Sequence, residues 1–210
     1  MSPKKSAVRT VIKVGGGLLR DPAGFERVVV ALNVIEPGHR VLIVPGGGPF
    51  ANAVREFDRR IPVGSDPAHW MAILGMDQFA HALATRIAGG QLVEREAEIG
   101  RTLDRGRIPV LAPYRWLRAT DPLPHSWDVT SDSIAAWIAA TVGARRLVLI
   151  KPAAGEAGSL VDAYFVRALK PGIEHLVLPV DDVRELRIVL GEYRGGPRSS
   201  TLRTRGDRRS

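Results

Sequence analysis

Two short apolar segments that each run into three consecutive glycines constrain this chain most. They read "VIKVGGG" from Val11 and "VLIVPGGG" from Val41. Apolar strands of this kind, separated by helical patterns, favour a parallel sheet that is covered by helices on both faces. In open α/β sheets, ligands bind beyond the carboxyl ends of the strands, where both glycine triplets would lie. The sequence therefore predicts an α/β fold with a ligand site at that edge.

Strand and helix patterns alternate along most of the chain. The predicted strands cover residues 7–14, 40–45, 107–114, 145–152 and 175–178. The predicted helices cover residues 22–35, 50–60, 69–88, 131–142 and 180–190. Asp21 is a suitable N-cap for the first helix, and either Thr130 or Ser131 could cap the fourth.

The composition excludes several classes of function. The chain has no cysteine, which excludes disulfides, thiolate catalysis and cysteine-based metal sites. No apolar run reaches the roughly 18 residues that are needed to span a bilayer, and no signal-peptide pattern follows the N-terminal lysines. We therefore expect a cytoplasmic protein with no membrane partner.

The net charge of +8 comes largely from the C-terminal end of the chain. Residues 194–210 contain six arginines and one aspartate. We expect one domain over residues 1–193, followed by a basic, flexible tail over residues 194–210. The tail reads more readily as a solubilising terminus than as a nucleic-acid-binding arm, so we do not expect a nucleic-acid partner.

The two glycine triplets are candidate phosphate-binding loops. Gly15, Gly16 and Gly17 end the first strand, and Gly46, Gly47 and Gly48 end the second. Glycine lets the backbone approach a phosphate so that amide N–H groups can point at it. The alternative is that both are simple turns. There is no GxxxxGK[ST] motif and no clean GxGxxG fingerprint, which argues against a Walker A loop and a dinucleotide site.

Lysine is rare here, since only five of the 30 basic residues are lysines. Lys13 lies inside the first apolar strand, near its carboxyl end, and Lys151 ends the strand that reads "LVLIK". Both are placed to reach a phosphate held by the loops. The alternatives are a Lys13 that extends to solvent along its apolar stem and a Lys151 that is simply exposed.

A pair of aspartates precedes the fourth helix, in "SWDVTSDSIAAWIAATVGA". Asp128 and Asp132 are four residues apart, with Thr130 and Ser131 between them. A capping segment would account for Asp132 in the first helical turn, but it leaves Asp128 unexplained. In the functional interpretation, Asp132 holds the lysines and Asp128 faces the substrate.

Together these residues suit phosphoryl transfer. That chemistry needs donors around the phosphoryl oxygens, cations near the attacking and leaving oxygens, and a fixed geometry. Lys13, Lys151, the glycine N–H groups and a magnesium ion would supply them. A strong base is optional if the acceptor is already a phosphate or carboxylate oxygen.

The order of these motifs resembles the amino acid kinase family, over roughly residues 8–203. The resemblance implies a three-layer α/β/α sandwich with a mainly parallel central sheet, ATP and Mg²⁺ as cofactors, and a homo-oligomer. It also implies roles for individual residues. Lys13 and the first glycine loop would contact the transferred phosphoryl group, and the second loop would hold the acceptor. Asp132 would organise the lysines, and Asp128, with Thr130 beside it, would touch the acceptor.

Within that family the chain is most similar to the small kinases of methanofuran biosynthesis, on "HWMAILGMDQFAHALA" and "SWDVTSDSIAAWIAA". This implies a small-molecule phosphate as acceptor, namely an aminomethylfuran phosphate whose ammonium could pair with Asp128. Other acceptors, such as a nucleoside monophosphate or a carboxylate, stay open.

The sequence also departs from the family. Lys151-Pro152 replaces the usual Thr/Ser-Asp, and the second catalytic lysine has no clear match. Lys151 is the candidate and Lys170 the reserve. A relative that binds a ligand without catalysis is therefore an alternative.

Overall fold

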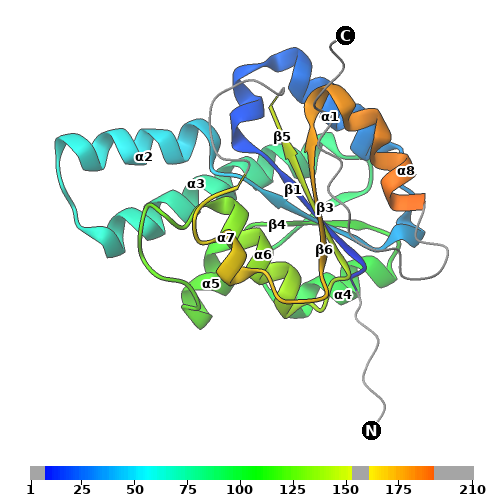
Figure 1. Cartoon of the computed structure of the whole chain (residues 1–210). Coiled ribbons are helices and arrows are strands. Elements are labelled where there is room, and N and C mark those ends of the chain that lie inside the picture. The colour runs from blue at the N-terminus through cyan, green and yellow to red at the C-terminus, as the bar shows by residue number, and fades with distance from the viewer. Residues whose placement is uncertain (1–7, 153–160, 192–210) are drawn as a thin grey trace, which may run out of the picture.

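The structure, a computed structural model, describes residues 8–152 and 161–191 (Figure 1). The described residues form a six-stranded sheet in the order β3-β4-β2-β1-β5-β6, and each adjacent pair of strands is parallel. The strands are β1 (Thr10–Val14), β2 (Val41–Pro45), β3 (Gly90–Val93), β4 (Ile108–Leu111), β5 (Arg146–Lys151) and β6 (Glu174–Pro179). The predicted α/β class with a mainly parallel sheet is confirmed.

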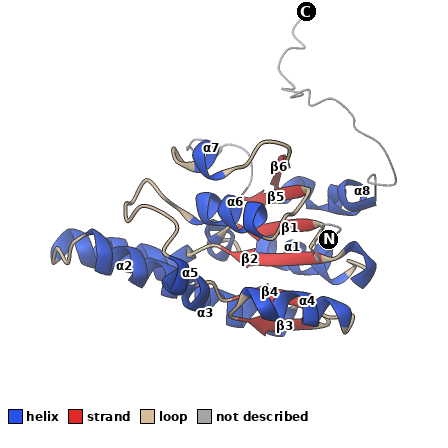
Figure 2. Cartoon of the chain, turned by 90° about the horizontal axis from the view of Figure 1, so that it is seen from below, coloured by secondary structure: helices blue, strands red, loops and turns tan. Residues whose placement is uncertain are grey.

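Helices lie on both sides of this sheet. Figure 2 shows the strands in their spatial order, from β6 at the top to β3 at the bottom. The α-helices are α1 (Pro22–Asn33), α2 (Gly48–Arg60), α3 (Ser65–Arg86), α4 (Glu96–Asp104), α5 (Tyr114–Thr120), α6 (Ser131–Thr141), α7 (Phe165–Ala168) and α8 (Leu186–Gly191). Short 3-10 helices are η1 (Gly16–Arg20), η2 (Pro37–His39) and η3 (Val180–Glu185). No helix in the described ranges is long and apolar enough to cross a bilayer.

The alternation of side chains along each strand builds two apolar cores, one on each face of the sheet. In β1, Val11 joins the core that includes residues of α4, α5, α6 and α7. Ile12 and Val14 join the opposite core, which includes residues of α1, η3 and α8. Helix α3 contributes to both cores. Because both faces are covered, all five residues of β1 and of β2 are buried, which explains why their sequences are mostly apolar.

The predicted elements agree with the structure except at a few places. The predicted strand 7–14 begins in the structure at Thr10, and its first residue lies outside the described part, as does the predicted tail over residues 194–210. Strand β3 and helices α4, α5 and α7 were not predicted. Asp21 does occupy the N-cap of α1, but its side chain makes no capping hydrogen bond and lies 3.7 Å from Arg27 instead.

The predicted helix over residues 180–190 is wrong in its first half, where the chain forms the 3-10 helix η3. Val180 and Val183 are buried there, and Leu186, which is also buried, begins α8. Side chains three residues apart align on one face of a 3-10 helix, which has three residues per turn. The apolar spacing of three therefore suits the tighter helix.

Candidate active site

A cavity of about 360 Å³ lies at the carboxyl ends of β1 and β5, between the two glycine loops. Four of the predicted residues that carry side chains line it: Lys13, Thr130, Asp132 and Lys151. The glycines that line it are Gly15, Gly16, Gly17, Gly47 and Gly48. The edge of the sheet at which the sequence predicts a ligand site therefore carries a real cavity.

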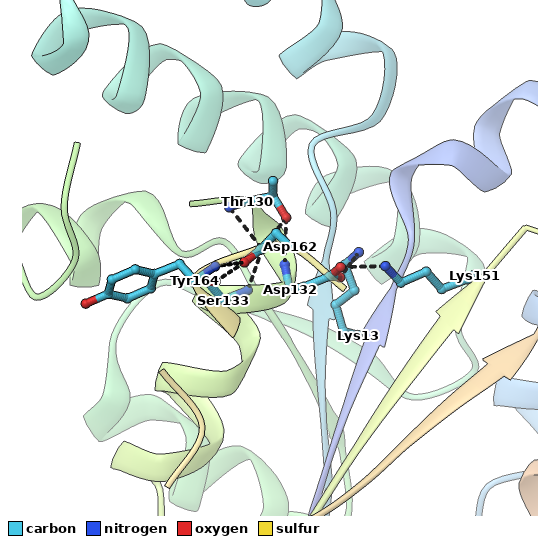
Figure 3. A network of polar contacts seen from close by, with 7 residues as sticks. All are labelled: Lys13, Thr130, Asp132, Ser133, Lys151, Asp162 and Tyr164. Atoms are coloured by element: carbon cyan, nitrogen blue, oxygen red, sulfur yellow. Dashed lines mark hydrogen bonds and ion pairs between the residues drawn. The ribbon is translucent and has the colours of Figure 1, made fainter. Parts of the chain in front are cut away.

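Asp132 lies between the two lysines, as Figure 3 shows. Its Oδ1 atom is 2.8 Å from Nζ of Lys13, and its Oδ2 atom accepts a hydrogen bond of 2.5 Å from Nζ of Lys151. The register of the sheet makes this possible, because β1 and β5 are adjacent and pair Lys13 with Leu149, two residues before Lys151. One carboxylate thus gathers both lysines.

Burial distinguishes the members of this triad. Lys13 and Asp132 are each 4% exposed, whereas the Lys151 side chain is 23% exposed. Burial lowers the pKa of Lys13, and Lys151 acts in the same direction, while Asp132 opposes both. Burial alone would raise the pKa of Asp132, but the two lysines together lower it. Asp132 is therefore held as a carboxylate at neutral pH.

A second aspartate, Asp162, fixes the helix that carries Asp132. Its Oδ2 atom accepts hydrogen bonds from the backbone N and the hydroxyl of Thr130, at 3.1 and 2.6 Å, and from the backbone N of Ser133 at 3.1 Å. Its Oδ1 atom accepts from the hydroxyl of Ser133 and from the backbone N of Tyr164 (Figure 3). Thr130 in turn N-caps α6 by accepting from the backbone N of Asp132. Asp162 therefore anchors the first turn of α6.

The glycine loops touch one another, and only part of each faces the cavity. A Cβ atom on Gly16 would lie 2.1 Å from the backbone N of Gly48. Any larger residue at position 16 would therefore force the two loops apart. The first glycine of each loop extends the sheet instead: the amide of Gly15 donates to Ile150, and that of Gly46 donates to Val14, both at 2.8 Å. These two amides are therefore not directed at a ligand, contrary to the simplest interpretation of the motif.

The wall opposite the lysines comes from α2, α3 and the loop before α6. Gly48, Ala51, Asn52 and Arg55 line it from α2, and their spacing of three and four residues places them on one helical face. Helix α3 contributes His69, Ala72, Ile73 and Met76, and the loop contributes Trp127 and Val129.

Arg55 and Trp127 join the two sides of this wall. The guanidinium carbon of Arg55 lies 4.7 Å from the centre of the Trp127 ring, an arrangement typical of a cation–π contact. The indole N–H of Trp127 donates to Asp58 of α2 at 3.0 Å. The loop is thus held against α2, and an arginine is held beside the cavity.

The structure does not bring every predicted residue into the site. Asp128 is exposed, is hydrogen-bonded by the hydroxyl of Ser126 at 3.2 Å, and is absent from the cavity wall. Gly46 and Lys170 are absent from that wall as well, so Lys151 and not Lys170 is the second lysine of the triad.

Sequence reasoning missed Asp162, His69 and Trp127. Trp127 had one usable signal, its position next to Asp128. Asp162 stands alone in "SLVDAYF", and its role depends on contacts across 29 and 32 positions of sequence.

A second cavity, of about 450 Å³, lies at the opposite end of the sheet. It is lined by residues at the amino ends of β1 and β5, including Arg9, Thr10 and Arg146. Arg146 is paired there with Glu174 at 2.9 Å. This cavity is larger than the first, but it contains neither the lysine triad nor the glycine loops, so the candidate active site is the smaller cavity.

One known kinase is similar to this chain in sequence. A 139-residue segment is 29% identical to the [5-(aminomethyl)furan-3-yl]methyl phosphate kinase of Methanocaldococcus jannaschii. The match covers 66% of this chain and 63% of that protein's length.

Solved structures of kinases share the fold. The UMP kinase of Ureaplasma parvum superposes with a TM-score of 0.62 at 15% identity, covering 88% of this chain and 96% of that one. The UMP kinase of Bacillus anthracis gives 0.58 at 16% identity, covering 86% and 92%. The uridylate kinase of Archaeoglobus fulgidus gives 0.51 at 17% identity, covering 74% and 68%.

A match to a family model establishes the family of this chain. Residues 8–155 match the Amino acid kinase family, a span that holds both glycine loops, both lysines and Asp132. The chain belongs to the amino acid kinase family.

Proposed function

We propose that the protein is an ATP-dependent kinase that converts an aminomethylfuran phosphate into its diphosphate, in the cytoplasmic synthesis of a methanofuran-type cofactor. The observation that carries the phosphotransferase part is the triad of Lys13, Asp132 and Lys151 between two glycine loops. The acceptor is inferred from the similarity to the kinase of Methanocaldococcus jannaschii.

The charges of the cavity suit two phosphorylated ligands. Its lining includes Lys13, Arg20, Arg55 and Lys151, but Asp132 is its only carboxylate among the described residues. Such an excess of positive charge in a concave site raises the local concentration of anions. ATP and a phosphorylated acceptor both carry negatively charged phosphate groups, so the positive charge of the cavity favours the binding of both.

In the proposed reaction, an oxygen of the acceptor phosphate attacks the γ-phosphorus of ATP. A new P–O bond forms, and the bond to the oxygen bridging the β- and γ-phosphates breaks, giving ADP. The attacking oxygen is already ionised, so no base has to remove a proton. The ammonium groups of Lys13 and Lys151 would stabilise charge on the phosphoryl oxygens, and Asp132 would keep both in place.

The first turn of α2 would help to hold the phosphates, since Gly48 begins α2 and lines the cavity. The start of α6 is less available, because Asp162 and Thr130 already accept hydrogen bonds from the backbone N of Thr130, Asp132 and Ser133. Helix N-termini present unpaired N–H groups and a partial positive charge, which favour bound anions.

Mg²⁺ fits this arrangement as a companion of ATP. The described ranges contain no group of three His, Asp or Glu side chains that could hold a metal ion. Mg²⁺ commonly keeps several waters and binds through substrate phosphates with one or two carboxylates. When bound, it would neutralise charge on the nucleotide phosphates, while the lysine triad positions the phosphoryl group.

Asp128 stays a proposed contact for the aminomethyl group. It lies between Trp127 and Val129, which both line the cavity, although Asp128 itself is exposed. An unchanged KM for the acceptor in Asp128→Asn would remove it from the site.

The test is ADP release from MgATP with 5-(aminomethyl)-3-furanmethanol phosphate, run beside UMP, aspartate and N-acetylglutamate. Turnover with the furan phosphate alone, which Asp132→Asn abolishes, is the expected result. Turnover with UMP instead would identify a nucleoside monophosphate kinase. Ligand binding without ADP release from any acceptor would favour a non-catalytic relative, which the unusual Lys151-Pro152 pair makes the main alternative.

A further inference from the structure

A second ionic cluster is centred on His125. It lies beside the acceptor wall, the part of the cavity that is lined by Trp127, Val129 and Thr130. The Nδ1 atom of His125 is 2.7 Å from a carboxylate oxygen of Asp66, and its Nε2 atom is 2.8 Å from one of Asp121. The two carboxylates come from different places, the first turn of α3 and the C-cap of α5. The His125 side chain is only 15% exposed.

This geometry specifies the charge of the ring. A neutral imidazole has one N–H donor and one nitrogen lone pair, whereas the imidazolium has two donors. Carboxylate oxygens at hydrogen-bond distance from both nitrogens can both be satisfied only by the imidazolium. Burial alone would lower the pKa of His125, but the hydrogen bonds to Asp66 and Asp121 raise it overall.

A second histidine lies flat against the first. The rings of His69 and His125 stack with centres 4.3 Å apart and planes 19° apart. The edge of Trp70 closes the pair, and Arg118 lies 4.8 Å above the Trp70 ring. Burial lowers the pKa of His69 to about 4, and His125 acts in the same direction. His69 lines the cavity. Its imidazole is therefore neutral at a pH at which that of His125 is still charged.

The cluster is attached to the loop that forms the acceptor wall. Residues 121–130 join α5 to α6, and Trp127, Val129 and Thr130 of this loop line the cavity. Trp127 ties the loop to α2 through Asp58. His125 ties the same loop to α3 through Asp66.

We propose that His125 acts as a positively charged latch that bridges Asp66 and Asp121 and so positions residues 121–130 as the acceptor wall of the cavity. His125 touches no reacting group and is a positioning residue. Its effect on the acceptor rests on the proposed function, but the latch itself does not.

The latch is expected to open as the pH rises. Loss of the proton removes one donor and leaves one carboxylate facing a nitrogen lone pair. Because the pKa of His125 is raised in the folded protein, its stabilising contribution is full below the ordinary value of about 6.5 and falls as the pH rises through the raised value. The titratable groups that face His125 are Asp66, Asp121 and His69, with Arg118 beyond the Trp70 ring, and the hydrogen bonds to the two aspartates are what raise its pKa.

The latch can be tested without turnover, by NMR of protein labelled with ¹⁵N at histidine and tryptophan. We expect both nitrogens of His125 to be protonated at pH 6.5, with a titration midpoint above that value. The indole N–H of Trp127 should shift with the same midpoint. His125→Gln and Trp127→Phe assign the two signals. A His125 midpoint at or below about 6.5 would overturn the proposal. So would a Trp127 chemical shift that does not change as His125 titrates.

Asp121→Asn provides a matched variant. Asp121 has a φ of 42°, and asparagine also tolerates this left-handed conformation, so the substitution removes charge while it keeps the backbone. We expect the His125 midpoint to fall by about one pH unit, as for loss of one adjacent opposite charge. Asp182→Asn, at an exposed residue of η3, should leave the His125 midpoint unchanged. An unmoved midpoint in Asp121→Asn would contradict the latch.

Kinetics then connect the latch to the acceptor. We expect the KM for the furan phosphate to rise about tenfold as the pH passes the His125 midpoint, as for loss of one charged hydrogen bond. The KM for MgATP should not follow, and Asp121→Asn should move the rise to lower pH. A flat acceptor KM in a working enzyme would overturn the positioning role. Absence of turnover would refute the proposed function and leave the NMR result to decide the latch.

Discussion

At the scale of single residues, Asp132 is decisive because it is the carboxylate that two lysines share. Its contacts with Lys13 and Lys151 are 2.8 and 2.5 Å long. Burying a charge is unfavourable unless it is paired, and Lys13 and Asp132 are both almost completely buried. Each therefore depends on the other for stability as well as for any catalytic role.

Asp132→Asn should destabilise the fold as well as abolish activity. The change leaves a buried ammonium without its counter-ion, which costs about 3–5 kcal/mol. Adding Lys13→Met in the same chain removes that ammonium and should restore much of the loss. Urea denaturation of the single and double variants measures both effects.

The control for this experiment is the same substitution in an exposed ion pair. Asp104, with a side chain 70% exposed, pairs with Arg40 at 3.0 Å. Asp104→Asn should cost less than about 1 kcal/mol. If the double variant Lys13→Met/Asp132→Asn were no more stable than Asp132→Asn alone, an uncompensated Lys13 charge would not be the cause.

Sequence patterns indicated that the three residues of the triad lie close together, as they do, but missed the residues that support them; the catalytic roles of the triad stay predictions. Lys13 and Lys151 were recognisable because lysine is rare in this chain and both lie near the ends of apolar strands. Asp162 and His125 gave no such signal. Their roles come from partners far away in sequence, such as Asp66, which lies 59 positions from His125, and local patterns do not contain that information.

At the scale of elements, the first turn of α6 is the part that must be held in place. Thr130 caps it, and Asp162 accepts hydrogen bonds from Thr130 and Ser133 on either side of Asp132. The first turn of a helix has backbone N–H groups without partners inside the helix, and here Asp162 satisfies two of them. The direction of the Asp132 carboxylate thus depends on a residue outside the helix.

Asp162→Asn should therefore weaken both the fold and catalysis. An amide cannot accept on both of its terminal atoms, so hydrogen bonds from Ser133 or Thr130 are lost, at a cost of about 2–4 kcal/mol. We also expect kcat to fall at least about tenfold, because misplaced groups reduce rate steeply. Thermal unfolding and ADP release measure the two effects.

Asp77→Asn is the matched control, since Asp77 also holds the start of a helix, accepting from the backbone N of Tyr114 in α5 at 3.0 Å. Burial raises the pKa of Asp77 to about 6, so the neutral amide is a mild change. It lies outside the cavity wall, and its turnover should stay near that of the parent. Equal losses of kcat in both variants would show a general effect of stability.

Strands were most easily predicted where burial is nearly complete. β1, β2 and β5 are mostly apolar because both faces of the sheet are covered, and their sequences reveal them. β3 lies at one edge of the sheet, has only four residues and buries only Val93. Its sequence, "GQLV", is too short and too mixed to distinguish a strand from a loop.

At the scale of the whole molecule, α2 lies largely at the surface. Figure 1 shows it extending away from the sheet, beside α3. All of α2 is described, and none of its residues is buried. Nevertheless Phe50 and Phe57 of α2 and Ile61, which follows the helix, are 36%, 42% and 58% exposed, and the seven-residue spacing of Phe50 and Phe57 places them on one side of the helix. Exposed apolar stripes of this kind mark association surfaces.

We therefore expect this stripe to pair with that of a second copy, as the resemblance to the amino acid kinase family implies for a homo-oligomer. Phe57→Glu/Ile61→Glu places charge on it and should convert the protein to monomers, as measured by sedimentation velocity. Val166→Glu is the control, because Val166 is an apolar residue of α7, 77% exposed, that lies away from the stripe and should leave the mass unchanged. A parent protein that sediments as a monomer would contradict the prediction. An oligomer that survives the double substitution would place the interface on another element, because a buried glutamate pair at the contact could not be accommodated.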